Sequence, residues 1–226
     1  MRKIVVVVLL VLMLAAVGFA QQGYVGRIDG FGSYSYFTSP RLNLVARGFN
    51  GQAGVNVNRW LAMGFDFSVF DGHTTLYPNM LSAGVKSNLA ATLPPALLPS
   101  AYIPYSARIY TYAAGPQINI RKLKWATFFV HPDLGALHAD VTANPTNPLQ
   151  TLLVNNLVGP TGKTSDTVVF WGIGGGIDWN LTKHFGLRTA TDLVRMNMFS
   201  SMLDGPRNSI RISVGPTVHF GKNLEK

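Results

Sequence analysis

The stretch Ser209–Phe220, SIRISVGPTVHF, decides the fold predicted for this chain. Its alternate residues form two sets, one apolar throughout and the other small, polar or charged. Successive side chains of a strand point to opposite faces, so the segment has one apolar and one polar face. Its length suits the ~9–11 residues of a tilted membrane-crossing strand. The apolar set is Ile210, Ile212, Val214, Pro216, Val218 and Phe220.

The same alternation recurs along the rest of the chain and predicts seven more strands. Proline lies inside one of them, at Pro132, where it cannot donate to a ladder and predicts a bulge or a weakened pair. Phe129 breaks the alternation of that segment. The predicted strands lie near residues 24–37, 49–58, 61–69, 105–120, 125–138, 167–180 and 185–193.

The connections between these strands are predicted to alternate between short turns and longer loops. Short turns are expected at 58–60, 121–124 and 181–184, and longer loops at 38–48, 71–104, 141–166 and 197–208. Such asymmetry is typical of outer-membrane barrels, with short periplasmic turns and long outer loops. Trp60, Trp125 and Trp179 each lie beside a short turn, as expected of an interfacial aromatic girdle.

Two of the longer loops carry apolar stretches. Within 71–104, residues 80–93 are compatible with a short helix over the barrel mouth. Residues 93–104 and 149–158 are unusually apolar for exposed segments, and exposed apolar patches often mark contacts. We expect these stretches to fold over the mouth or to bind a partner or surface.

Residues 1–20 have the features of a cleavable signal peptide: Arg2 and Lys3, an apolar run over 4–17, and small residues at 18–20. This leaves residues 21–226 as one predicted domain. After residue 20 no apolar run approaches the ~20 residues of a membrane helix. A membrane-spanning chain without such helices must close its sheet, because every backbone polar group in lipid needs an internal partner.

The composition limits the classes of partner that we expect for this chain. The chain has 19 basic and 10 acidic residues and no cysteine, which excludes disulfides and lipoprotein modification. Its cations are scattered along an exported chain, so we expect no nucleic-acid partner. Anionic lipid headgroups, including lipopolysaccharide phosphates, suit the charge better.

The predicted fold class is therefore all-β, an eight-stranded antiparallel up-and-down transmembrane barrel. A barrel of this size is only wide enough for its own side chains. We expect its charged side chains to pair inside, because unpaired charges there are costly. Inward glycines at 172, 174 and 176 would leave room for long neighbours such as Arg188. The inward candidates are Arg27, Asp29, Asp66, His131, Asp133, Asp178, Arg188, Asp192 and Arg211.

Several short motifs in the chain resemble those of nucleotide-binding, hydrolytic or metal sites but do not predict such a site. Gly162-Lys163-Thr164 resembles the end of a phosphate-binding loop, but Leu157 stands where the first glycine belongs. The glycines of 172–176 fail the dinucleotide pattern at Ile177. The pairs His131/Asp133 and His138/Asp140 make a Ser–His–acid hydrolase or acyltransferase conceivable. Five dispersed histidines do not suggest a metal site. We therefore predict no catalytic, cofactor-binding or metal residues and no cofactor.

The chain resembles the small OmpA/OmpX-like outer-membrane β-barrel family. The resemblance is carried by GGGIDWNLTKHFGLR at 174–188, TATDLV at 189–194 and NSIRISVGPTVHFG at 208–221. Ser213, Gly215, Val218 and Phe220 resemble the C-terminal signal by which such barrels are recognised for assembly. The resemblance implies a porin-family protein of the Gram-negative outer membrane that meets the barrel-assembly machinery during biogenesis.

The expected function is a non-enzymatic, monomeric barrel with a structural and surface-contact role. Outer-membrane lipid and lipopolysaccharide are the expected partners, with a possible surface ligand at the outer loops. Two alternatives stay open: a narrow passive channel, and an outer-membrane lipid A-modifying enzyme.

Overall fold

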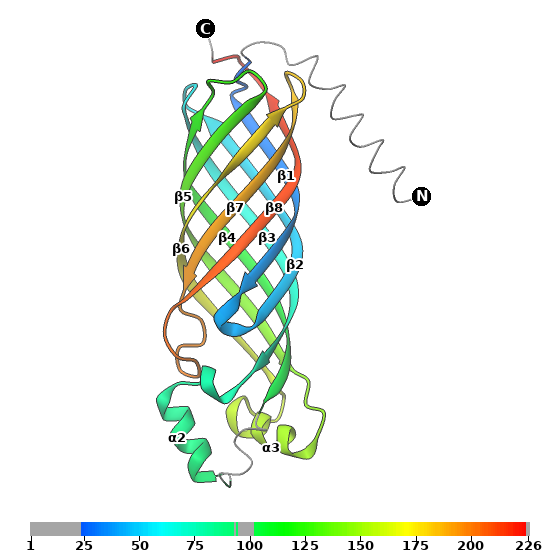
Figure 1. Cartoon of the computed structure of the whole chain (residues 1–226), viewed down its shortest axis with the longest axis vertical. Helices are drawn as coiled ribbons and strands as arrows, with labels where there is room; N and C mark the ends of the chain where they lie inside the picture. Colours follow the sequence, from blue (N-terminus) through cyan, green and yellow to red (C-terminus); the bar gives the residue numbers. More distant parts are fainter. Residues whose placement is uncertain (1–23, 93, 95–101, 225–226) are drawn as a thin grey trace, which may run out of the picture.

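A computed structural model describes residues 24–92, 94 and 102–224. Within them, eight antiparallel strands close into a barrel, each paired with its neighbours in sequence and β8 with β1 (Figure 1). The predicted fold class is confirmed. The strands are β1 (Ile28–Ser39), β2 (Leu44–Asn56), β3 (Leu61–Leu76), β4 (Ile103–Ile120), β5 (Ala126–Ala143), β6 (Lys163–Asn180), β7 (Phe185–Met196) and β8 (Arg207–Phe220).

Parts of two predictions lie outside the described residues. These are the signal peptide at 1–20 and most of the apolar stretch at 93–104, of which 93 and 95–101 are not described. Among the described residues, no helix is both long enough and apolar enough to cross a membrane.

Both ends of the described chain lie at the same end of the barrel as the three short turns (Figure 1). The turns occupy 57–60, 121–125 and 181–184. The indoles of Trp125 and Trp179 stack with their ring centroids 5.5 Å apart, and Trp60 lies in the first turn. All three rings are substantially exposed, so they mark one rim of the barrel as the predicted aromatic girdle.

The first connection at the opposite end differs from the prediction. The expected loop at 38–48 is a single 3₁₀ turn, η1 (Pro40–Leu42), followed by Asn43 in the left-handed conformation with φ 48°. The expectation that short and long connections alternate throughout is therefore wrong. Residues 44–48 extend β2 instead, with Leu44 and Ala46 buried. The sequence pattern did not indicate a strand at 44–48, because the inward side chains here are apolar and the charged side chain of Arg47 points outward.

The other outer connections contain helices. η2 (Pro78–Met80) and α2 (Ala83–Thr92) follow β3, which confirms the helix expected within 80–93. α3 (Pro148–Leu157) follows β5, where only a loop was predicted. The Asn147 side chain accepts a hydrogen bond from the Gln150 N–H at 2.9 Å, and Pro148 occupies the first turn. These are standard helix-start signals that sequence reasoning overlooked.

These connections fold together into a cap over the mouth opposite the short turns, called the outer mouth here after the predicted orientation (Figure 1). The Ser82 N–H donates to the Met202 carbonyl at 2.8 Å, and the Asp204 N–H donates to the Met80 carbonyl at 3.0 Å. Leu153 and Val154 of α3 are buried in the same apolar cluster as Leu81. The apolar stretch at 149–158 therefore folds over the mouth, which is one of the two roles expected for it.

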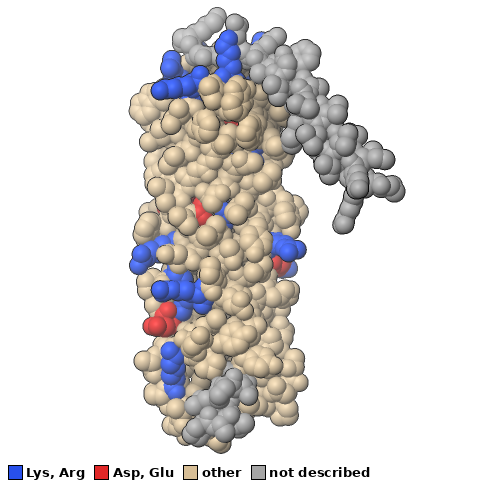
Figure 2. Space-filling view, in the orientation of Figure 1, with Lys and Arg blue, Asp and Glu red and all other residues tan. Residues whose placement is uncertain are grey.

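The polarity of the wall inverts along the barrel. Toward the short turns, the outward side chains are mostly apolar and the inward ones mostly polar. Toward the cap, the outward side chains of Arg47, Asp71, Arg108 and Asp140 stand opposite one another across β2–β5. The outer end of the barrel is thus built like a water-soluble barrel. In Figure 2 Lys and Arg atoms appear at the upper rim and again from mid-height downward.

An apolar plug fills the interior of that outer end. Phe37, Phe70, Ile109 and Leu137 are each at most 1% exposed. The rings of Phe37 and Phe70 pack with centroids 5.3 Å apart. Together with residues of the cap, they form one continuous hydrophobic cluster.

Three of the four prolines inside the strands coincide with gaps in the ladder. Pro116 and Pro132 face a gap between β4 and β5, where residues 115–117 and 131–133 have no Cα partners across the pair. Pro216 lies at a similar gap between β8 and β1. Each proline keeps a partner on its other side. The weakened pair predicted at Pro132 is confirmed, and it falls where proline lacks the N–H that the ladder would use.

The plug makes Phe70 a test of the apolar outer interior. Replacing a fully buried phenylalanine with alanine leaves a cavity and costs about 3–5 kcal/mol. We expect Phe70→Ala to lower the free energy of unfolding by about this amount, measured by urea unfolding in detergent micelles. The volume-conserving Phe70→Leu should cost less than about 1.5 kcal/mol. Equal losses for the two variants would contradict a tightly packed plug.

Candidate functional site

The polar interior between the short turns and the plug is the candidate site. Of the nine inward residues predicted, eight lie there, contributed by β1, β3, β5, β6, β7 and β8. Arg27 does not, because it precedes β1 and is exposed. Asn50 and Gln52 of β2 also join the network through their side-chain amides.

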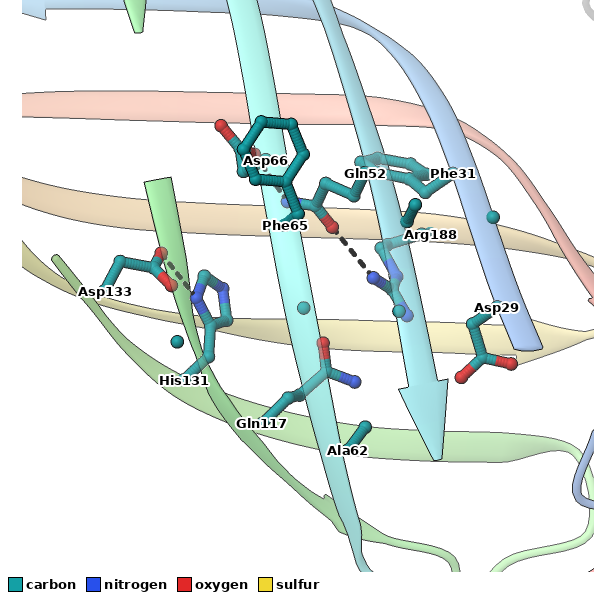
Figure 3. A pocket seen from close by; sticks show the side chains of 15 residues that line it. Asp29, Phe31, Gln52, Ala62, Phe65, Asp66, Gln117, His131, Asp133 and Arg188 are labelled. Carbon is teal, nitrogen blue, oxygen red and sulfur yellow. Dashed lines mark hydrogen bonds and ion pairs between the residues drawn. The ribbon is translucent and has the colours of Figure 1, made fainter. Parts of the chain in front are cut away.

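Arg188 of β7 forms the layer nearer the short turns. Its Nε and Nη2 donate to the two carboxylate oxygens of Asp178 at 2.5 and 2.8 Å, and Nη1 donates to Gln52 Oε1 at 2.9 Å. Figure 3 shows Gln52 reaching toward Arg188 from β2. The guanidinium also lies 4.4 Å from the Phe129 ring centroid and 5.2 Å from that of Phe31. The inward Phe129 that broke the predicted alternation is therefore a stacking partner for a buried cation.

Arg211 of β8 forms the second layer and joins two carboxylates. Its Nε donates to Asp192 at 2.7 Å and its Nη1 to Asp66 at 2.7 Å. Asp66 in turn accepts the side-chain amides of Asn50 at 2.5 Å and Gln52 at 2.9 Å. The pairing expected for Arg188 and Arg211 is confirmed, and Gln52 links the two layers.

His131 of β5 lies between two further carboxylates. Its Nδ1 is 2.7 Å from Asp133, a contact visible in Figure 3, and its Nε2 is 3.2 Å from Asp192. A Cβ at residue 174 would collide with Asp192 and His131, whereas one at 176 would first meet the Thr189 carbonyl and then the Phe129 ring, and one at 172 would meet the Leu193 carbonyl. Gly174 therefore makes room for inward side chains, while Gly172 and Gly176 lie mainly against the backbone of β7. Arg188 is not among the nearest contacts of these glycines, so the room expected for it is not what they provide.

Little space remains between these side chains. A cavity of about 30 Å³ lies among Gln52, Asp66, His131 and Arg188 (Figure 3). Where the polar layers meet the plug, beside Phe37, Phe70 and Arg211, the cavity volume is about 10 Å³. A single water needs roughly 10–15 Å³ of such volume. The cavity at this junction therefore holds at most about one water.

His131 is not placed as the general base of a hydrolase. A general base needs a hydroxyl nucleophile at its free nitrogen, whereas both nitrogens of His131 face carboxylates. His138 lies on the outer wall, with Nδ1 2.7 Å from Thr167 Oγ1 and Nε2 3.4 Å from Asp140. The neighbouring hydroxyl is thus a threonine's, on an exposed surface.

His131, Asp133 and Asp192 also bring one ligand atom each within 4.8 Å of one another. Sequence reasoning missed this cluster because Asp192 lies on a non-adjacent strand. Asp133 already bonds His131, and Asp192 already bonds Arg211, so the arrangement is accounted for as part of the ion-paired network. The prediction of no catalytic, cofactor-binding or metal residues stays a prediction.

No known protein-family profile matches the chain, and no curated protein matches it. Solved structures do. Neisserial surface protein A is 12% identical with a TM-score of 0.51, over 85% of this chain and 96% of that one. The outer membrane protein OprG from Pseudomonas aeruginosa is 8% identical with a TM-score of 0.51, over 90% and 100%. At these identities the likeness shows the fold alone, that of small outer-membrane barrels, and the OmpA/OmpX relationship remains a resemblance.

The network around Arg211 predicts an asymmetry between breaking it and replacing it. Arg211→Ala would leave Asp66 and Asp192 buried without their cation, which costs about 3–5 kcal/mol. We expect a correspondingly lower midpoint of the heat-induced gel shift. The combined variant Arg211→Met, Asp66→Asn and Asp192→Asn removes all three charges and should lose less. A combined variant less stable than Arg211→Ala would contradict the charge argument.

Proposed function

We propose that this protein is a non-enzymatic, monomeric barrel of the bacterial outer membrane. Its interior is closed, and its role is structural, with surface contacts made by the outer cap. Lipid and lipopolysaccharide surround it, and the barrel-assembly machinery meets it during biogenesis.

The outer wall supports residence in a bilayer. Phe49, Leu134 and Val169 point outward and are 71%, 64% and 72% exposed. Such a continuous apolar band would be costly in water but suits hydrocarbon, and tryptophans border it at one rim. At its other edge Arg47 and Arg108 are placed to meet lipopolysaccharide phosphates.

The observation that carries the closed interior is its two-part filling. The ion-paired layers of Arg188 and Arg211 occupy one part, and the plug of Phe37 and Phe70 occupies the next. An ion following the axis would have to displace buried, paired charges and then enter an apolar layer. This arrangement favours a structural barrel over the narrow-channel alternative.

The cap supports the surface-contact role. It stands beyond the charged row of the wall, and α3 leaves Leu152 49% exposed while its opposite face is buried. A cavity of about 230 Å³ opens among α2, α3 and Met202, lined by apolar and amide side chains. Such a surface suits contact with a partner outside the membrane.

Conductance separates the closed barrel from a channel. We expect the purified barrel in planar bilayers to show no unitary current steps above the leak of a protein-free membrane. Arg188→Ala and Arg211→Ala should lower heat stability without opening a steady path, because the plug remains. Steady currents from the unaltered protein, or a marked rise in either variant, would favour the pore.

Cysteine labelling tests placement and orientation, since the chain has no cysteine of its own. Lys86 lies in α2 of the cap, and Lys183 lies in the last short turn. On intact cells, a membrane-impermeant maleimide should label Lys86→Cys and leave Lys183→Cys unlabelled. After the outer membrane is permeabilised, both should react. The reverse pattern on intact cells would overturn the proposed orientation.

A further inference from the structure

The mouth at the short-turn end carries a one-signed charge that the proposed function does not use. The described segments forming this rim are 24–27, 57–60, 121–125, 181–184 and 221–224, and none contains an aspartate or glutamate. Their basic residues are Arg27, Arg59, Arg121, Lys122, Lys124, Lys183 and Lys222. Figure 2 shows Lys and Arg atoms gathered at this end on the visible face.

A cavity of about 430 Å³ lies inside this rim. Arg121, Lys122, Lys124 and Lys183 line it, contributed by two separate turns. The side chains of Thr127, Thr182 and Asn180 line it as well and add neutral hydrogen-bonding groups. This volume is many times the roughly 10–15 Å³ that one water needs, so a hydrated anion fits.

The two carboxylates that also line the cavity already have hydrogen-bond or ion-pair partners. Asp29 binds His219 Nδ1 at 2.7 Å and the Asn56 amide at 2.6 Å, with Arg121 4.0 Å away. Asp178 is held by Arg188 from the barrel side. Asp178 is thus paired by Arg188, and Asp29 offsets part of the charge of Arg121 and leaves the three lysines without a carboxylate partner among the described residues.

Arg121 is fixed across the mouth. One guanidinium nitrogen donates to the Arg59 carbonyl, and another donates to Asn56 Oδ1 at 3.2 Å. These two hydrogen bonds hold one cation in place beside the lysines, and neither of them involves a lysine ammonium group. A preorganised cluster of one sign in a concave, partly desolvated site concentrates counter-ions of the opposite sign.

We propose that this basic vestibule, the cavity lined by Arg121, Lys122, Lys124 and Lys183, binds a phosphate-bearing anion. Lysines act as point charges toward phosphate, and threonine hydroxyls can donate to its remaining oxygens. The same chemistry serves a soluble phosphate compound and the headgroup of an anionic phospholipid whose acyl chains lie beside the tryptophan rim. The proposal stands on the charges of this mouth and does not depend on the role of the cap.

Two matched variants test it. The vestibule variant is Lys122→Gln, Lys124→Gln and Lys183→Gln. The control, Arg41→Gln, Lys86→Gln and Lys163→Gln, removes the same number of charges from the opposite end. The heat-modifiable gel shift establishes that both fold. Calorimetry in uncharged detergent measures inorganic phosphate and pyrophosphate binding. Nanodiscs of phosphatidylcholine with and without phosphatidylglycerol, followed by native mass spectrometry, measure retained anionic lipid.

We expect the unaltered barrel to bind at least one of these probes, more weakly as salt is raised. The vestibule variant should weaken that binding at least ten-fold, and the control less than two-fold. Phosphate binding in detergent assigns the site to a soluble anion, whereas selective retention of phosphatidylglycerol alone assigns it to a headgroup. Binding of neither probe, or equal losses in the two variants, would overturn the proposal.

Discussion

The pairing of β8 with β1 is the contact on which the rest of the structure depends. In hydrocarbon, an open sheet edge would leave a row of N–H and C=O groups without partners, each at a cost of several kcal/mol. Closure removes both edges at once. Pro116, Pro132 and Pro216 are compatible with this constraint, because they lie at gaps in the ladder and their missing N–H leaves no donor to be satisfied there.

Closure in turn fixes what the interior must contain. An eight-stranded cylinder leaves room for side chains and little else, so every inward position needs a packing or bonding partner. Here the answer changes along the axis. Bidentate and branched ion pairs fill the part surrounded by the apolar wall, and aromatic and aliphatic side chains fill the part surrounded by the charged wall. The same barrel interior is thus filled by paired charges in one part and by apolar packing in the other.

The strand number, the antiparallel order and most inward charges could be predicted because period-two alternation is strong wherever the wall faces lipid. The partner of each charge could not, because Arg211 joins residues of β3 and β7 through a register that alternation does not specify. The outer ends of the strands were lost for a different reason. At residues 44–48 and beyond Val69 the inward side chains become apolar and the outward ones polar. A prediction that expects polar residues inside therefore assigns these strand segments to loops. Phe129 departs from the alternation of its strand because its inward ring stacks on the guanidinium of Arg188, a contact that the sequence pattern does not indicate.

The charged row on the outer wall also bears on biogenesis. For the cap to reach the far side of a bilayer, Arg47, Asp71, Arg108 and Asp140 must pass through its hydrocarbon once. A lone charge at the bilayer centre costs roughly 2–4 kcal/mol on a barrel strand. These four alternate in sign on consecutive strands, and Arg108 lies 2.6 Å from Asp71. Strands that have already paired when they insert carry this row across as near-neutral couples, whereas strands entering singly would bear each full charge.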